Sequence, residues 1–321
     1  ITTCFHVDDL LFTCNNEQML TNVVQQFGSK FRGISIQKGN NINYLGLNIH
    51  RNRNKDIELS MIKYSKDIGE SCGITQKDKT PNTETLFEDD NDESIFLTED
   101  NRKIFHTIVA KLLYLAKKLR PDILTAISYL ASKVNQPTVN DNNKLTKVVK
   151  YVNNTINYKS IYKYNTPIGI TAYVDASFGC HSDGKSRSGI AVMLCGGMIY
   201  TSSSKQKIVT KSSTEAELVA LSDACDQIQW CIEFIKYQGL ITRNNVILED
   251  NKSTITLIKT GKTSKRTRHI KVKYFGMKEL IDNNILDIVY CETKNMYADI
   301  LTKPTVGRKF INLRDMVCKL E

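Results

Sequence analysis

The stretch Ser212-Ser213-Thr214-Glu215-Ala216-Glu217-Leu218-Val219-Ala220-Leu221 opens a long helical pattern in the second half of the chain. Thr214 and Glu217 have the spacing of a capping box, in which two side chains satisfy free backbone N–H groups at a helix start. The pattern continues to Gln238, and Gly239 is the residue type that commonly closes a helix. We therefore predict a helix from Thr214 to Gln238 with two glutamates near its start.

The segments on either side of this helix show alternating apolar and polar residues or short apolar runs, both of which are typical of strands. Strands are expected at 168–174, 188–194, 197–200, 246–248 and 285–290, and helices at 253–259, 271–282 and 296–301. Three strands, a helix, and then strands alternating with helices describe a mixed five-stranded sheet with flanking helices. The expected fold class is therefore α/β, of the mixed α+β kind.

The first half of the chain follows another pattern. Strands are expected on both sides of a turn at Val7-Asp8-Asp9-Leu10, and a further strand pair at Ile42–Ile49 and Ile57–Met61. Residues 73–101 are polar and acidic, which is typical of a surface loop. Helices are then expected near 104–115, 123–134 and 144–152.

Length and composition set the broad class. A chain of 321 residues suits two domains. We place them at 1–152 and 167–321, joined by a linker at 153–166 that is rich in Asn, Lys and Tyr. No apolar run approaches the roughly 18 residues that span a membrane. The chain opens in a strand-like run, without Met or a signal peptide, so we expect a piece of a longer protein.

Charge and cysteine content favour an intracellular protein with a polyanionic partner. The chain carries 44 basic and 34 acidic residues, for a net charge of +10. Such a balance favours nucleic acid, because phosphate neutralisation drives binding; a merely soluble basic protein is the alternative. The 9 cysteines form no C-x-x-C pair, and most lie in apolar stretches. We expect them to be reduced, and we expect no zinc site.

Four carboxylates lie at the ends of expected elements. Asp175 and Asp250 follow strands, and Glu217 and Asp299 lie in the first turns of helices. Ligands gather at the carboxyl ends of strands in such sheets, and Mg²⁺ prefers oxygen ligands. Two ions about 4 Å apart would activate a water and stabilise the leaving 3′ oxygen of a phosphodiester. Singly, each residue has an ordinary alternative: a turn residue for either strand-end aspartate, a helix cap for Glu217, and a helix-dipole partner for Asp299.

Four motifs together carry a resemblance to a known family. Tyr173-Val174-Asp175-Ala176-Ser177, the run 212–221, Asp250-Asn251-Lys252-Ser253 and Ala298-Asp299-Ile300-Leu301-Thr302-Lys303-Pro304 resemble the ribonuclease H domain of copia-type LTR retrotransposons. The resemblance implies a ribonuclease H-like fold at 167–321. It also implies a catalytic quartet at Asp175, Glu217, Asp250 and Asp299 that holds two Mg²⁺ ions, with Mn²⁺ as a substitute.

Two further glutamates, Glu215 and Glu249, lie next to or near members of this quartet in the sequence and are alternative metal ligands. Glu217 is preferred to Glu215 because Ala216-Glu217-Leu218 resembles the run that holds the catalytic glutamate in related retroviral domains. The family's usual Cys-Asp-Asn is here Glu249-Asp250-Asn251, and its Asp-Ala-Asp-Trp is Asp175-Ala176-Ser177-Phe178. Because strand side chains alternate, Glu249 should point to the opposite face of the sheet from the site.

A basic stripe surrounds His269. Its expected phosphate contacts are Lys262, Lys265, Arg266, Arg268, Lys271 and Lys273. A solvated loop and helix start is the alternative. Thr267-Arg268-His269-Ile270 resembles the family's Thr-Lys-His-Ile, which gives His269 a catalytic role in product release or phosphate binding, or else a structural one.

The N-terminal half resembles another part of the same polyprotein. Phe5-His6-Val7-Asp8-Asp9-Leu10-Leu11 is similar to the Tyr-Val-Asp-Asp hairpin of reverse transcriptases, and Tyr44–Ile49 and Arg120–Ile123 resemble the end of the palm, the thumb and the connection. Asp8 and Asp9 would then be a polymerase remnant. The family's fingers and third metal-binding aspartate lie upstream of this hairpin, so we expect the chain not to polymerise DNA.

The expected function is an endonuclease that cuts RNA in RNA/DNA hybrids by a two-metal mechanism. Expected partners are the hybrid and other parts of a polyprotein, without a membrane. The expected location is intracellular: the cytoplasm, in a virus-like particle, and also the nucleus. The alternatives are a catalytically silent nucleic-acid-binding relic and an integrase-like enzyme. The four carboxylates and the missing His/Cys zinc module count against the integrase.

Overall fold

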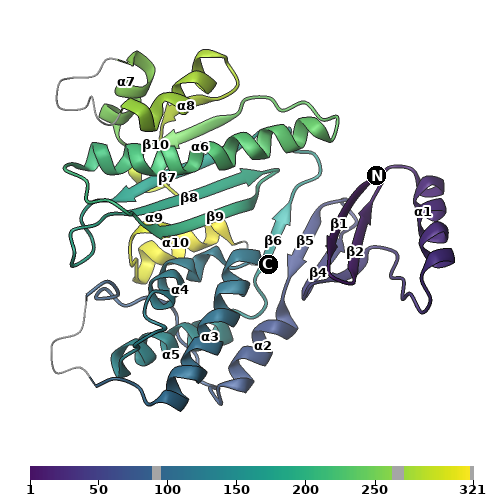
Figure 1. Cartoon of the computed structure of the whole chain (residues 1–321), viewed down its shortest axis with the longest axis horizontal. Helices are drawn as coiled ribbons and strands as arrows, with labels where there is room; N and C mark the ends of the chain where they lie inside the picture. Colours follow the sequence, from purple (N-terminus) through teal and green to yellow (C-terminus); the bar gives the residue numbers. More distant parts are fainter. Residues whose placement is uncertain (89–94, 262–270, 319–321) are drawn as a thin grey trace.

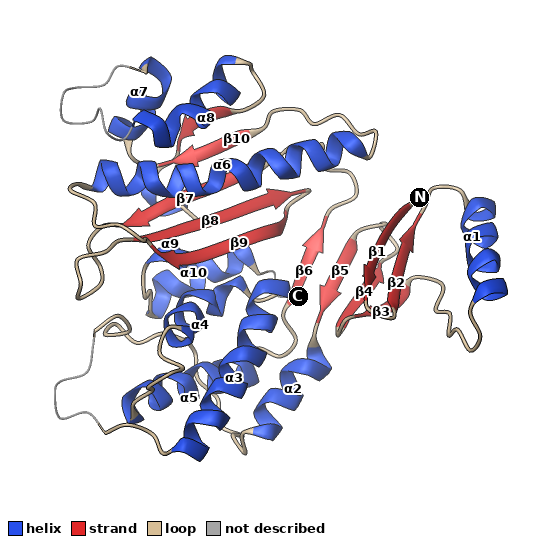
Figure 2. Ribbon diagram, viewed as in Figure 1, coloured by secondary structure: helices blue, strands red, loops and turns tan. Residues whose placement is uncertain are grey.

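A five-stranded mixed sheet covered by helices on both faces forms the second half of the chain. The computed structural model describes residues 1–88, 95–261 and 271–318, and residues 271–275 by backbone alone. Figures 1 and 2 show the sheet with one long helix crossing its front, a group of helices below it, and a smaller sheet with a hairpin at the N-terminal side. In the part of the chain that the structure describes, no helix is long and apolar enough to span a membrane.

The elements of the first half are, in chain order, β1 (Thr2–His6), β2 (Asp9–Thr13), α1 (Glu17–Lys30), β3 (Asn41–Tyr44), β4 (Leu47–Arg51), β5 (Ile57–Ser60), α2 (Ile62–Ser71), α3 (Glu99–Lys118), η1 (Pro121–Ile123), α4 (Leu124–Ala131), α5 (Val139–Asn154) and β6 (Lys159–Tyr162). Those of the second half are β7 (Thr171–Ser177), β8 (Arg187–Leu194), β9 (Gly197–Lys205), α6 (Ser213–Tyr237), β10 (Val246–Glu249), α7 (Lys252–Thr260), α8 (Lys271–Asp282), β11 (Asp287–Tyr290), η3 (Thr293–Asn295), α9 (Asp299–Thr302) and α10 (Gly307–Val317).

The large sheet has the strand order β11-β10-β7-β8-β9. β7, β8 and β9 form an antiparallel meander, and β10 and β11 join it in parallel. Alternate residues of β7 face opposite cores: Ala172 and Val174 pack in the core under α6, whereas Tyr173 packs in the core that contains α9 and α10. The predicted mixed five-stranded sheet with flanking helices is confirmed.

The N-terminal sheet differs from the prediction in two places. The expected strand Ile42–Ile49 is two strands, β3 and β4, because Leu45 and Gly46 turn the chain with φ of +51° and +77°. The expected linker at 153–166 contains β6, which pairs with β5 and completes a four-stranded antiparallel sheet. That segment is therefore part of a sheet rather than a free connection. The domain boundaries at 152 and 167 stay a prediction.

One hydrophobic core joins α3, α4 and α5 of the first half to the last two helices of the chain. Residues of α3, α4 and α5 pack in one cluster with Ile300 and Leu301 of α9 and Phe310 of α10. Part of the segment 73–101 also belongs to this core, since Leu86 and Phe87 are buried. The prediction of a surface loop was wrong for those residues.

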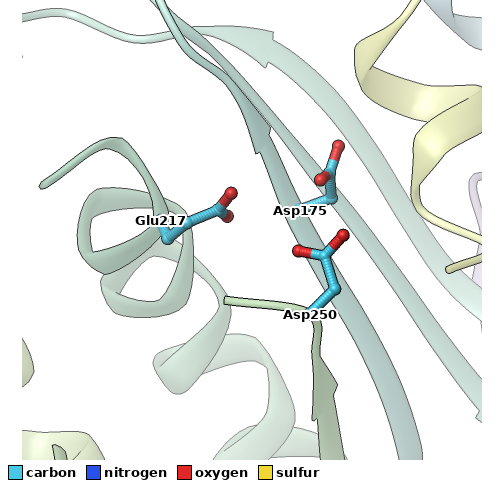
Figure 3. Close-up of side chains that lie close together, drawn as sticks. All are labelled: Asp175, Glu217 and Asp250. Atoms are coloured by element: carbon cyan, nitrogen blue, oxygen red, sulfur yellow. The ribbon is translucent and has the colours of Figure 1, made fainter. Parts of the chain in front are cut away.

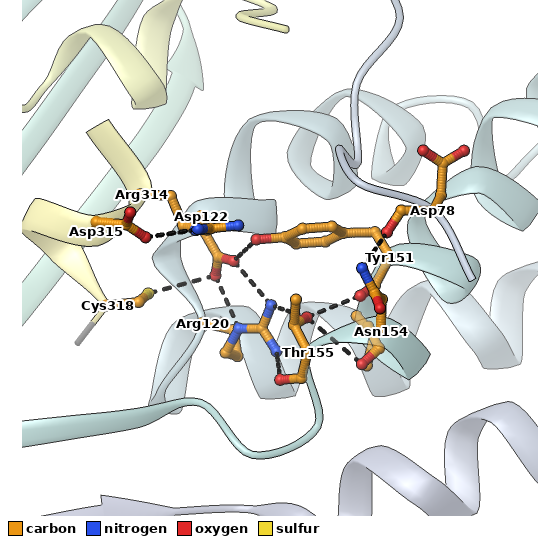
Figure 4. A network of polar contacts seen from close by, with 10 residues as sticks. Asp78, Arg120, Asp122, Tyr151, Asn154, Thr155, Arg314, Asp315 and Cys318 are labelled. Carbon is orange, nitrogen blue, oxygen red and sulfur yellow. Dashed lines mark hydrogen bonds and ion pairs between the residues drawn. The ribbon is translucent and has the colours of Figure 1, made fainter. Parts of the chain in front are cut away.

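A buried polar network ties the same helices together (Figure 4). The Arg120 guanidinium donates to both carboxylate oxygens of Asp122, at 2.9 and 2.8 Å, and to the carbonyl of Thr155 at 3.0 Å. The Tyr151 hydroxyl donates to Asp122 at 2.6 Å, and the Cys318 thiol approaches the same carboxylate at 3.5 Å. Because Cys318 follows α10, this network connects the last helix of the chain to the N-terminal helices.

Candidate functional site

Three of the four predicted carboxylates meet at one end of the large sheet (Figure 3). Asp175, Glu217 and Asp250 each offer an oxygen, and these oxygens all lie within 4.8 Å of one another. Asp175 and Glu217 are buried, whereas Asp250 is partly exposed. Within residues 1–88, 95–261 and 276–318 this is the one group of possible metal ligands of this size that is found.

The strand register brings the two aspartates together. β7 and β10 are parallel neighbours in which Tyr173 lies opposite Leu248. Two residues further along the chain from this pair are Asp175, in β7, and Asp250, directly after β10, at the same end of the sheet. The sequence predicted a strand that ends at residue 174, with Asp175 directly after it. In the structure β7 continues to Ser177, so Asp175 lies inside the strand.

The start of α6 separates the roles of its two glutamates. The Ser212 hydroxyl accepts the backbone N–H of Glu215 at 3.2 Å, and the Glu215 carboxylate accepts the N–H of Lys211 at 2.8 Å. The cap is therefore made by Ser212 and Glu215, not by the predicted pair Thr214 and Glu217. This leaves the Glu217 side chain to extend toward the two aspartates.

Asp299 lies beside this group and is joined to it by a lysine. It is fully buried at the first position of α9. The Lys303 ammonium contacts the Asp299 carboxylate and also lies 3.4 Å from Asp175, while Lys309 lies 2.8 Å from the other oxygen of Asp299. The Thr302 hydroxyl donates to Asp175. The fourth predicted carboxylate therefore contacts the site through Lys303.

Burial and mutual repulsion raise the pKa values of three carboxyl groups here, those of Asp175, Glu217 and Glu249. Burial raises the pKa of Asp175; Lys303 opposes this, and the Asp299 charge adds to it. Burial, and then the neighbouring charge of Glu249, raise the pKa of Glu217. The pKa of Glu249 is raised as well, chiefly by burial. Each shift follows from bringing several anions into a water-poor space.

Glu249, which sequence reasoning set aside, lies close enough to this site to interact with its charges. It is fully buried on the strand face that Ile247 shares, under α6, so it does alternate away from its neighbour Asp250. Glu217 also comes from α6, and the two carboxylates repel each other. The sequence signal was present: a glutamate inside a buried strand, directly before a predicted ligand.

The donor set fits hard divalent cations. All its groups are carboxylates, and the buried Glu217 Oε2 has no hydrogen-bond partner among the described residues. Mg²⁺ and Mn²⁺ bind such oxygens and keep several waters. A cation bound here would also stabilise the folded protein, because its charge would offset the repulsion between these carboxylates.

This electrostatic arrangement predicts a pH dependence of stability. Groups with a raised pKa in the folded state bind protons more tightly there than in the unfolded chain, so their contribution to the free energy of unfolding is present below pH 4.5 and decreases as pH rises above it. In EDTA, wild type should therefore lose stability relative to Glu217→Gln between about pH 5 and about pH 8. Thermal denaturation of both proteins measures the difference.

Mg²⁺ serves as the control for that prediction. Metal and protons compete for the same oxygens, so added Mg²⁺ should raise the melting temperature of wild type more at the higher pH than at the lower. The Glu217→Gln variant should show a smaller rise at both. An equal effect of Mg²⁺ at the two pH values would contradict the electrostatic account.

The other predicted site residues are not brought to this centre within the described part of the chain. Lys262, Lys265, Arg266, Arg268 and His269 lie outside the described residues, and Lys271 and Lys273 are described only as backbone at the start of α8. Asp8 lies in the β1–β2 turn and Asp9 begins β2. Both are exposed, and neither belongs to a group of three possible metal ligands among the residues searched. Their role as a polymerase remnant stays a prediction.

Comparisons with known proteins cover nearly the whole chain. No family model matches it. The retrovirus-related Pol polyprotein from transposon RE1 of Arabidopsis thaliana is 29% identical over 320 residues, which is 97% of this chain and 21% of that protein. A truncated transposon Ty1-A Gag-Pol polyprotein of Saccharomyces cerevisiae is 26% identical over 331 residues, 97% of this chain and 27% of that protein.

Solved structures align with part of the chain. LC11-RNase H1, from a compost metagenome, aligns with a TM-score of 0.34 at 19% identity, over 42% of this chain and 92% of that one. The same enzyme in complex with an RNA/DNA hybrid aligns with a TM-score of 0.33, over 41% and 93%. The two polyproteins cover far more of this chain, which itself spans 21% and 27% of their lengths. The chain is a homologue of copia/Ty1-type retrotransposon Pol polyproteins over nearly its entire sequence.

Proposed function

We propose that the second half of the chain is a ribonuclease H-type endonuclease that cuts the RNA strand of RNA/DNA hybrids. The observation that carries the proposal is the convergence of Asp175, Glu217 and Asp250 within 4.8 Å, with Asp299 joined to them through Lys303. Carboxylates from separate elements around one point are the ligand set that two-metal phosphodiester hydrolysis requires. The relatives are Pol polyproteins, which supports a nucleic-acid substrate.

Each residue has a definite task in this mechanism. Asp175, Glu217 and Asp250 would hold the divalent ions, Mg²⁺ with Mn²⁺ as a substitute, and Asp299 would complete the second site. Bound metal supplies an activated water and stabilises the leaving 3′ oxygen. Lys303 keeps Asp175 and Asp299 close together despite their repulsion. The net charge of +10 draws the phosphate backbone to the protein.

Hybrid specificity would come from shape and from contacts to 2′-hydroxyl groups rather than from base sequence. Other parts of a polyprotein as partners, and an intracellular location in the cytoplasm and the nucleus, belong to the same proposal.

A panel of labelled duplexes tests the proposed function. In Mg²⁺ the full chain should cut the RNA strand of an RNA/DNA hybrid, and it should leave single-stranded RNA, RNA/RNA and DNA/DNA of the same sequence intact. EDTA should stop the reaction. Cutting of single-stranded RNA as fast as hybrid, or no cutting of hybrid in either Mg²⁺ or Mn²⁺, would overturn the proposal.

A further inference from the structure

The short helix α9 lies at the boundary between the two halves of the chain. All four of its residues, Asp299 to Thr302, are fully buried. It carries Asp299 at its start, and Thr302 at its end donates to Asp175. β8 presses against it: a side-chain carbon at Gly189 would lie 2.5 Å from Thr302 and 3.0 Å from the Ala298 carbonyl. The position of this one helical turn therefore sets the position of two carboxylates.

This turn cannot satisfy its own C-terminal carbonyls. A helical carbonyl normally accepts the N–H four residues later. For Ile300 that residue is Pro304, which has no N–H. For Leu301 it is Thr305, whose N–H is donated to the Lys303 carbonyl instead, at 2.8 Å. Buried carbonyls need a donor, so two must come from elsewhere in the protein.

Hydroxyl groups from two other elements supply them. The Thr125 hydroxyl, from α4 in the N-terminal half, donates to the Ile300 carbonyl at 2.6 Å. The Ser203 hydroxyl, from β9, donates to the Leu301 carbonyl at 2.6 Å. Arg187 in turn donates to Ser203 at 2.8 Å and to Ser128 of α4 at 2.7 Å. α4 and β9 are thereby held to each other as well as to α9.

We propose that Thr125 is a positioning residue of the metal centre, through which the N-terminal half orients the Asp299 helix. The inference rests on the proposed metal centre and deepens it. The helices at 99–154 then do more than cover the nuclease sheet: their α4 supplies the hydrogen bond that fixes the register of α9 against Asp175. Partners behind metal ligands commonly change metal affinity about 10- to 100-fold when they are removed.

The test compares Thr125→Val, which removes the hydroxyl at nearly constant volume, with Thr125→Ser, which retains it. Both are made in the full chain. Mn²⁺ alone is titrated into each folded protein, and free Mn²⁺ is followed by electron paramagnetic resonance. Thr125→Val should weaken Mn²⁺ binding about 10-fold, and Thr125→Ser should restore it. Thr107→Val is the matched control, because the exposed Thr107 hydroxyl also donates to a helix carbonyl, that of Lys103 in α3, at 2.9 Å.

Hybrid cleavage by the same proteins gives a second readout, in which kcat should fall in Thr125→Val while KM stays unchanged. In an Asp299→Asn background, the effect of Thr125→Val on Mn²⁺ affinity should disappear, because the hydroxyl acts through α9. If Thr125→Val does not fold, Ser203→Ala removes the companion bond and takes its place in the titration.

The outcomes separate the inference from the proposed function. A lower melting temperature with unchanged Mn²⁺ affinity would make Thr125 merely structural and overturn the inference alone. Mn²⁺ binding that responds to Thr125 in a chain that cuts no hybrid would support the inference and overturn the proposed nuclease. A wild-type chain that binds no Mn²⁺ would overturn both.

Discussion

Asp250→Asn should lower the rate of hybrid cleavage by more than about 100-fold, the upper range for losing a mere supporting partner of a metal site. The substitution converts the Asp250 carboxylate into an uncharged amide, because an NH2 group replaces one carboxylate oxygen. It leaves the shape of the side chain and the acceptor for the Thr293 hydroxyl, which bonds the carboxylate at 2.8 Å. Because Asp250 is partly exposed, the fold should tolerate the change. Initial rates on labelled hybrid in Mg²⁺ measure the effect.

Asp226→Asn is the matched control for that experiment. It makes the same change of charge on the exposed side of α6, away from the three carboxylates. Its cleavage rate should stay within about twofold of wild type, as is usual for surface changes. Equal rates for Asp250→Asn and Asp226→Asn would show that Asp250 holds no catalytic metal.

Asp122→Ala should produce the largest loss of stability. Asp122 is fully buried and accepts hydrogen bonds from Arg120 and Tyr151. Removing it leaves the Arg120 charge buried without its counter-ion, a change that costs about 3–5 kcal/mol in comparable pairs. Urea denaturation followed by circular dichroism should show that loss as a lower midpoint. The loss should extend to the second half of the chain, since Cys318 contacts the same carboxylate.

An exposed ion pair provides the comparison. Glu99 and Arg102 pair at 2.7 Å on the surface of α3. Such pairs contribute little because water and salt screen them, so Glu99→Ala should leave the urea midpoint nearly unchanged. A midpoint for Asp122→Ala as high as that of Glu99→Ala would contradict the role given to the buried network.

The element pattern of the second half could be predicted from sequence because its signals are local. Alternation marked β7 and β8, and Gly239 marked the end of α6 to within one residue. The N-terminal sheet was harder. A turn at Leu45, a residue without a glycine's freedom at positive φ, divides an apolar run that reads as one strand. β6 forms a strand by pairing with β5, which lies about 100 residues earlier in the chain. A pairing between segments so far apart in sequence leaves no local signature.

The site shows the same division. Asp175, Glu217 and Asp250 could be predicted, because each follows a recognisable motif. The capping role of Glu215 depends on which serine begins the helix, and that is settled by backbone geometry. The ion pairs of Asp299 with Lys303 and Lys309, and the hydrogen bond from Thr125, join residues that only the tertiary fold brings together.

The most direct test of the central claim is the chemistry of the cut ends. Carboxylate-held metal ions activate water, so RNA products from a hybrid should carry 5′-phosphate and 3′-hydroxyl groups, and they should form only with a divalent cation present. Mass spectrometry of the fragments identifies both ends. Fragments ending in 2′,3′-cyclic phosphate, or fragments formed in EDTA, would mean that the RNA's own 2′-hydroxyl attacks, and would contradict the metal centre proposed at Asp175, Glu217 and Asp250.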